Sequence, residues 1–88
     1  MHTKFLKKFS RDLDKIKQPK DKKVILQLIQ NIQKSNSLDD ISNIKKLVGF
    51  SNAYRIRSGN IRLGVFVDGD TIEFARVAHR KNIYKIFP

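Results

Sequence analysis

Apolar positions in the first half of the chain recur at helical spacing. Between residues 24 and 32 they lie three and four positions apart with Gln and Lys between them, which predicts an amphipathic helix that begins near Pro19. An earlier stripe has the same spacing and consists of Phe5, Phe9, Leu13 and Ile16. It predicts a first helix, although the opening residues also suit a short edge strand.

A polar segment follows the second predicted helix. Ser37, with Asp40 three residues later, resembles a capping box in which Asp replaces the usual Glu. This pair predicts a single helical turn that ends near Ile41. The next residues lead through Gly49 towards the second half of the chain.

From Ala53 onward the apolar period changes from about 3.6 residues to about 2 residues. The alternation predicts three strands, at residues 53–57, 61–67 and 71–78. Gly59 lies in the first connection and can adopt positive φ, and Asp68–Gly69 in the second is a strong hairpin sequence. Residues after the third strand close the chain without a predicted element.

Helices followed by an antiparallel meander indicate an α+β fold. We expect the order (β)ααβββ, in which two N-terminal helices pack on one face of a small antiparallel sheet and leave the other face free. The chain has 88 residues, a length that suits one domain, so residues 1–88 are predicted to form a single unit.

Charge is the strongest global feature of the sequence. The formal net charge of +11 opposes compactness, so a polyanionic partner is expected, with nucleic acid as the first candidate. An acidic protein or an anionic membrane surface also fits the charge alone. Most lysines lie in the first half, whereas all but one of the arginines lie between Arg55 and Arg80. Arginine binds phosphate with an oriented fork, so the second half is the expected binding region.

Several classes of protein are disfavoured by the composition. The chain has no cysteine, which excludes disulfides and thiolate metal sites, and its two isolated histidines do not suggest zinc. We therefore predict no metal and no small-molecule cofactor. No apolar run approaches the roughly 20 residues that a membrane span needs, and the basic N-terminus lacks a signal-peptide core. The predicted location is cytoplasmic, without membrane association.

Three arginines are expected on one face of the sheet. Arg55 and Arg57 share a face because side chains alternate along a strand. If the turn pairs Arg57 with Arg62, then Arg62 joins that face, whereas a slip of one residue would bury the guanidinium groups at a cost of several kcal/mol. Like charges so close together predict an anion site. The alternative is a solvated basic face with no ligand.

The last residues add His79, Arg80 and Tyr84. If the chain turns back after the third strand, these groups reach the rim of the arginine face. Each also has a simpler interpretation, because His79 suits a hydrogen bond at a strand end and Tyr84 suits a place in the core.

At this point the residues match a known family. The segment 54–88 reads YRIRSGNIRLGVFVDGDTIEFARVAHRKNIYKIFP and resembles the RelE/ParE superfamily of toxins from bacterial toxin–antitoxin pairs. The resemblance rests on a basic-x-basic strand, a Gly turn, an Arg on the next strand, and a late His-Arg with a nearby Tyr. It implies two helices on a small antiparallel sheet. It also implies one of two activities, since RelE-like members cleave mRNA in the ribosomal A site and ParE-like members poison DNA gyrase.

Site residues follow from the same resemblance. The matching positions are Arg55, Arg57, Arg62, Arg80 and Tyr84. It assigns the three strand arginines to phosphate binding and charge stabilisation, Arg80 to the leaving-group side, and Tyr84 to base stacking or proton relay. The best-known relatives carry lysine at one or both of the first two positions. Arginine is a poor general base. We therefore infer that His79 takes that role, because histidine has an ordinary pKa of about 6.5.

The predicted function is therefore that of a toxin which cleaves mRNA on the ribosome without a metal, through attack of the 2′-OH on the adjacent phosphate. The expected partners are a cognate antitoxin, the ribosome and mRNA. Two alternatives remain: a ParE-like, non-enzymatic inhibitor of gyrase, and a catalytically weak module that only binds antitoxin or RNA.

Overall fold

The computed structural model describes all 88 residues and contains helices on both sides of one sheet. The helices are α1 (Lys7–Lys15), α2 (Pro19–Lys34), the single 3-10 turn η1 (Leu38–Asp40) and α3 (Arg80–Ile86). The strands are β1 (His2–Phe5), β2 (Ile44–Lys46), β3 (Ala53–Ser58), β4 (Ile61–Asp68) and β5 (Thr71–His79). None of the helices combines the length and apolar character that crossing a membrane requires.

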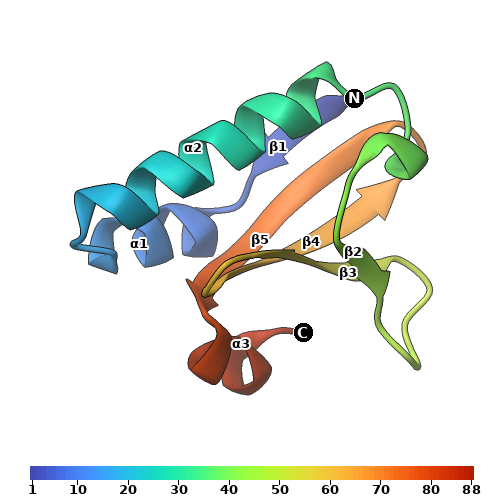
Figure 1. Cartoon of the computed structure of the whole chain (residues 1–88). Helices are drawn as coiled ribbons and strands as arrows, with labels where there is room; N and C mark the ends of the chain where they lie inside the picture. Colours follow the sequence, from blue (N-terminus) through green and yellow to red (C-terminus); the bar gives the residue numbers. More distant parts are fainter.

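The five strands form one mixed sheet in the order β1-β5-β4-β3-β2. Strands β2 to β5 are antiparallel neighbours, and β1 pairs with β5 in parallel at one edge. Figure 1 shows α1 and α2 together on one side of the sheet and α3 on the other side, next to the C-terminus. The sheet therefore has one fully covered face and one face that is only partly covered.

Two apolar clusters hold these layers together. The larger cluster contains 13 buried residues and lies between the sheet and the pair α1 and α2. The rings of Phe5, Phe9 and Phe74 contact one another within or beside it, with centroids 5.0 to 5.8 Å apart; Phe5 and Phe74 are stacked and the other pairs are tilted. The smaller cluster has five buried residues and lies under α3, where Ile83 and Phe87 meet the open face of the sheet. This second cluster fixes the position of α3.

The predicted fold class is confirmed, with additions. Helix α2 and strands β3 to β5 lie where the apolar periods indicate, and the opening residues form the edge strand β1 before α1 begins. Because β1 runs parallel to β5, the sheet is mixed rather than purely antiparallel. The structure adds the short strand β2 and the helix α3, neither of which the sequence predicts.

The predicted turn after α2 also forms, but with different capping. η1 ends at Asp40 and has Ser37 as its N-cap, yet the Ser37 side chain makes no capping hydrogen bond. Instead, the carboxylate of Asp40 accepts a hydrogen bond from the backbone N–H of Asn36 at 3.0 Å. The carboxylate of Asp40 thus accepts a hydrogen bond from the segment that leads into the turn.

A β-bulge interrupts the pairing of β4 with β5. Gly64 pairs with Arg76 and Val65 pairs with Phe74, so Ala75 has no partner on β4. A bulge changes the direction of the neighbouring side chains. Here it allows Ala75 to join the cluster under α3 while Phe74 stays in the main core.

Candidate functional site

The register of the β3–β4 hairpin brings three arginines to the open face. Arg57 pairs with Arg62, and Arg55 pairs with Gly64, as the alternation of apolar residues predicts. Ile56 and Leu63 point the other way and are fully buried in the main core. The register is fixed because a shift of one residue would exchange these apolar side chains with the guanidinium groups.

These arginines line a cleft of about 340 Å³ between the hairpin, β2 and α3. Its walls are made by Asn43, Ile44, Lys45, Leu47, Arg55, Arg57, Arg62 and Tyr84. Half of the lining side chains are cationic and none is acidic. The cleft is therefore suited to an anionic ligand.

Arg57 and Arg62 are oriented by neutral groups. The Arg62 guanidinium donates to the backbone carbonyls of Gly59 at 2.7 Å and Ile61 at 3.0 Å. Arg57 donates to the side-chain oxygen of Asn43 at 3.5 Å, a long contact. Neutral acceptors leave the positive charge uncompensated, so both guanidinium groups remain able to bind an anion.

Arg55 is held between the sheet and α3. Its guanidinium carbon lies 4.3 Å from the centre of the Tyr84 ring, a cation–π contact. One of its Nη atoms donates to the carbonyl of Phe87 at 3.4 Å, while Nε is buried without an acceptor. An unpaired buried donor costs about 1–3 kcal/mol, and such costs are found at functional sites more often than elsewhere.

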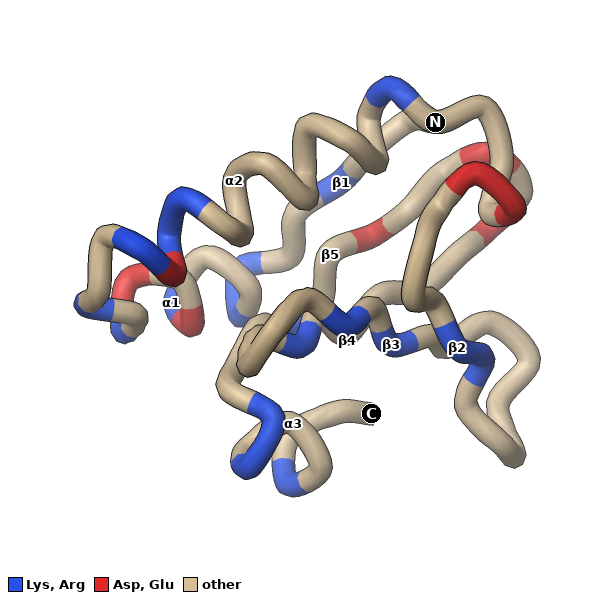
Figure 2. The backbone as a smooth tube through the Cα atoms, viewed as in Figure 1, with Lys and Arg blue, Asp and Glu red and all other residues tan.

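The cleft lies in the part of the molecule that lacks carboxylates. The chain has no Asp or Glu between residues 41 and 67 or between 74 and 88. Figure 2 shows the acidic residues on α1, at the start of α2, at η1, on β5 and near the β4–β5 turn, whereas Lys and Arg occur on both sides of the sheet and are the only charged residues along β2, β3 and α3. The ion pairs within the chain are His2–Asp70, Arg76–Asp12 and His79–Asp21. None of them uses an arginine of the cleft.

Lys45 belongs to the cleft, and the sequence reasoning missed it. It lies directly opposite Arg55 in the β2–β3 pairing and therefore points to the same face. β2 has only three residues, too few for the alternation of apolar and polar positions to be recognised.

His79 and Arg80 lie outside this cleft. His79 pairs across the sheet with Ile61, so its side chain lies on the face covered by α1 and α2, here called the helical face. Its Nε2 lies 3.2 Å from a carboxylate oxygen of Asp21. Arg80 begins α3, and its backbone N–H donates to the carbonyl of Asn60 at 2.8 Å. His79, Arg80, Asn60 and Lys81 line a separate shallow pocket beyond the hairpin turn. The structure thus unites Tyr84 with the three strand arginines but not with His79 or Arg80.

Arg76 is the other functional candidate that the sequence reasoning missed. It forms an ion pair with Asp12, which lies 64 positions away in the sequence. Hydrogen bonding to Asp12 raises the pKa of Arg76 above its ordinary value against the opposing effect of burial, and the charge of Asp12 adds to the rise. No group of three or more His, Asp or Glu side chains lies close enough together to hold a metal ion.

The fold and the cleft define a small, basic α+β domain with a carboxylate-free surface around the cleft. No protein-family model matches the chain. Toxin RelE3 from Methanocaldococcus jannaschii is 48% identical over 89 residues, which cover both proteins completely. The chain therefore belongs to the RelE family, the toxins of toxin–antitoxin pairs, and the resemblance noted in the sequence is confirmed.

Solved structures support the same assignment. The RelB-RelE antitoxin-toxin complex from Methanococcus jannaschii contains a chain with a TM-score of 0.80 and 47% identity, covering 97% of this chain and 99% of that one. A chain of the toxin–antitoxin complex RelBE2 from Mycobacterium tuberculosis has a TM-score of 0.73 at 23% identity, covering 90% and 96%. At that identity the likeness concerns the fold alone.

Proposed function

We propose that this toxin is an mRNA endoribonuclease that acts on the ribosome and needs no metal. The observation that carries the proposal is the cleft, in which Arg55, Arg57, Arg62 and Tyr84 lie together without a carboxylate. Membership of the RelE family supports an enzymatic role but does not specify the reaction. The net charge of +11 favours encounter with a particle made largely of RNA.

The proposed reaction is an internal transesterification of RNA. The 2′-oxygen forms a bond to the adjacent phosphorus, and the bond from phosphorus to the 5′-oxygen breaks. One proton leaves the 2′-OH and another is delivered to the departing 5′-oxygen, so the products are a 2′,3′-cyclic phosphate and a 5′-OH. Negative charge accumulates on the phosphorane oxygens in between, and fixed cations lower the barrier by stabilising it.

The cleft arginines fit the stabilisation of the charge on the phosphorane. We assign Arg57 and Arg62, with Arg55 beside them, to binding the phosphate and stabilising its developing charge. Arginine remains protonated at neutral pH, so it does not serve as the base. Tyr84 and Lys45 are the two remaining groups of the cleft that exchange protons, and we assign the proton transfers to them. The proposal does not use His79, which faces Asp21. Arg80 remains a candidate for a second contact to the RNA.

The test is to express the chain alone and to map the 5′ ends of cellular mRNA. The wild type is expected to arrest growth and to cut inside translated codons. Arg62→Ala is expected to reduce the cleavage rate about 100- to 1,000-fold, because it removes one cation from the developing charge. Cleavage of ribosome-bound mRNA by the purified proteins gives the rates.

The matched control is Arg11→Ala. Arg11 is an exposed arginine of α1 whose side chain makes no hydrogen bond or ion pair, so its loss removes the same charge far from the cleft. Circular dichroism of both variants checks that the fold is retained. Equal cleavage by Arg62→Ala and the wild type would contradict the proposal. Intact mRNA together with a DNA-damage response would instead identify gyrase as the target, and no toxicity at all would indicate a binding module.

We also propose that a cognate antitoxin neutralises the toxin, as the solved relatives are antitoxin–toxin complexes. An acidic antitoxin segment would cover the carboxylate-free surface and mask the cleft by mass action. Co-expression of the cognate antitoxin should restore growth. Persistent growth arrest in the presence of a bound antitoxin would count against masking of the cleft.

A further inference from the structure

Three residues in a row across the sheet hold the end of the chain. Arg55 on β3, Gly64 on β4 and Arg76 on β5 are cross-strand neighbours on the open face. The ring of Phe87 lies directly over Gly64, where any side chain would overlap it. Arg55 donates to the carbonyl of Phe87, and Arg76 donates to the carbonyl of Ile86, each at 3.4 Å. The two arginines therefore donate hydrogen bonds to two consecutive backbone carbonyls of the chain end, one from each side of Gly64.

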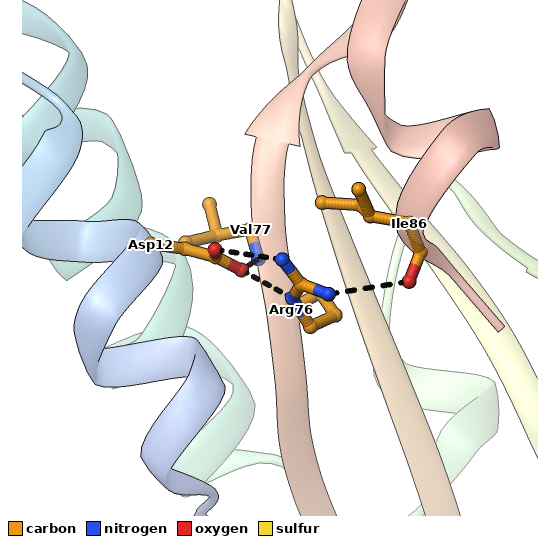
Figure 3. A network of polar contacts seen from close by, with 4 residues as sticks. All are labelled: Asp12, Arg76, Val77 and Ile86. Atoms are coloured by element: carbon orange, nitrogen blue, oxygen red, sulfur yellow. Dashed lines mark hydrogen bonds and ion pairs between the residues drawn. The ribbon is translucent and has the colours of Figure 1, made fainter.

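Arg76 is itself fixed by α1. Its Nε lies 2.7 Å from one carboxylate oxygen of Asp12, and its Nη2 lies 2.9 Å from the other. The backbone N–H of Val77 also donates to Asp12, at 3.1 Å. Figure 3 shows the guanidinium between the carboxylate of Asp12 and the carbonyl of Ile86, so that one planar group joins α1 and α3 across β5. The Asp12 side chain is 8% exposed, so the bidentate pair is shielded from water.

Helix α3 depends on such contacts for its position. It has seven residues, no side-chain cap and no acidic residue in its first turn, and a helix of this length is marginal in water by itself. It is held in place by the buried Ile83, the ring of Phe87 and the two backbone carbonyls that accept hydrogen bonds from the arginines. Tyr84 projects from the same helix, is 67% exposed, and has the guanidinium of Arg55 against its ring.

We infer that the Asp12–Arg76 pair positions Tyr84 in the cleft by clamping the C-terminal end of α3. The inference deepens the proposed function and rests on it for the role of Tyr84. Arg76 does not line the cleft, so it is a positioning residue rather than a catalytic one. Only a planar fork reaches both Asp12 and the carbonyl of Ile86, so the inference is specific for arginine at this position.

The first test observes Tyr84 without any substrate. The chain has two tyrosines, so Tyr54→Phe leaves Tyr84 as the only site for 3-fluorotyrosine. The ¹⁹F resonance is expected at a shift distinct from that of an unfolded peptide. Arg76→Lys keeps a cation opposite Asp12 but loses the fork, and it is expected to move the resonance towards the unfolded-peptide value. Arg11→Lys, the matched control on α1, is expected to leave it unchanged.

The second test measures cleavage in a double-mutant cycle. Arg76→Lys alone is expected to lower kcat roughly 10- to 100-fold with little change in KM, as displacement of a reacting group by about 1 Å does. In a Tyr84→Phe background the same change is expected to cost less than about twofold, because its effect passes through Tyr84. A general loss of fold would lower activity by the same factor in both backgrounds.

The two tests separate this inference from the proposed function. If Arg76→Lys and Asp12→Asn both leave the fluorine resonance unchanged, the clamp is overturned whether or not the protein cleaves RNA. A resonance that Arg76→Lys displaces, together with a wild-type protein that cleaves no RNA, would support the clamp and overturn the proposed function. Equal effects of Arg76→Lys on kcat with and without the Tyr84 hydroxyl would overturn the coupling to Tyr84.

Discussion

Four arginines on the sheet have different surroundings, and those surroundings separate their roles. Arg76 has a carboxylate partner, whereas Arg55, Arg57 and Arg62 contact only carbonyls, an amide and an aromatic ring. A paired guanidinium has its charge compensated within the chain and acts as a structural bridge. An unpaired guanidinium keeps its full field for a ligand. The absence of acids around the cleft, rather than the number of arginines, is what makes it a candidate anion site.

Gly64 tests the docking of the chain end at single-residue scale. Its φ is not positive, so alanine suits the backbone there, and the expected effect comes from overlap with the Phe87 ring. We predict that Gly64→Ala destabilises the fold by about 1–3 kcal/mol in urea denaturation. In a Phe87→Ala background the same substitution should have a much smaller effect, because the overlapping ring is gone. Equal destabilisation in both backgrounds would show that the contact with Phe87 is not the cause.

Single residues were predictable where alternation alone decides the face. The pairing of Arg57 with Arg62 follows from burying Ile56 and Leu63, and the structure has that register. The same alternation puts His79 on the face of Val77, which is the helical face, so its position away from the cleft was available from the sequence. The partnership of Arg76 with Asp12 was not, because it joins residues 64 positions apart and depends on a bulge.

At the scale of elements, the ion pair connects parts that belong to different layers. Asp12 lies on α1, Arg76 on β5, and the carbonyl of Ile86 ends α3 on the opposite face (Figure 3). Asp12 raises the pKa of Arg76 above its ordinary value, at which arginine is already charged across the physiological range of pH. The stabilisation that this raised pKa represents is present below the unfolded-state pKa of arginine and is lost only at higher, strongly alkaline pH.

Removal of the Asp12 carboxylate should therefore destabilise the fold strongly. We predict that Asp12→Asn lowers the free energy of unfolding by about 3 kcal/mol, since it leaves a partly buried guanidinium without its counter-charge. The control is Asp14→Asn, an exposed residue of the same helix, which should change stability by less than about 0.5 kcal/mol. Urea denaturation measures both variants. Similar values for the two would mean that Asp12 contributes no more than a surface charge.

Elements were predictable in proportion to their length and period. Helix α2 and strands β3 to β5 are long enough to repeat their apolar pattern, so the sequence predicts them. The three-residue β2 and the seven-residue α3 are too short for that, and they form because neighbours hold them. β2 pairs with β3, and α3 is anchored by Ile83 and Phe87. The cleft depends on both elements, so the sequence indicated its arginines and, through the family resemblance, Tyr84, but neither Lys45 nor the helix that carries Tyr84.

On the scale of the whole molecule, basic residues lie on both sides of the sheet, whereas carboxylates are absent from the segments that build the cleft. The acidic residues lie on α1, α2, η1 and β5 and at the β4–β5 turn, and the segments without carboxylates, 41–67 and 74–88, supply all the lining of the cleft (Figure 2). A net charge of +11 attracts polyanions in general from a distance, whereas the arrangement of charge decides which face meets them. Binding to RNA should therefore depend on salt through contacts of the cleft.

We predict the size of that dependence for a short single-stranded RNA. Each phosphate contact contributes about −0.7 to the slope of log K against log salt concentration, so the four cations of the cleft predict a slope of about −3. These cations are Lys45, Arg55, Arg57 and Arg62. Arg57→Gln should make the slope shallower by about 0.7, because it removes one phosphate contact. Fluorescence anisotropy between about 50 and 200 mM salt measures the slope.

The control for this prediction is Lys22→Gln. Lys22 is an exposed residue of α2, and α2 lies on the side of the sheet opposite α3 (Figure 1), whereas the cleft includes Tyr84 of α3. It carries the same charge as Arg57, so both variants lower the net charge equally. If binding is organised by the cleft, the slope for Lys22→Gln stays at the wild-type value. If both variants reduce the slope by the same amount, RNA is held by total charge, and the unpaired arginines of the cleft have no special part in binding it.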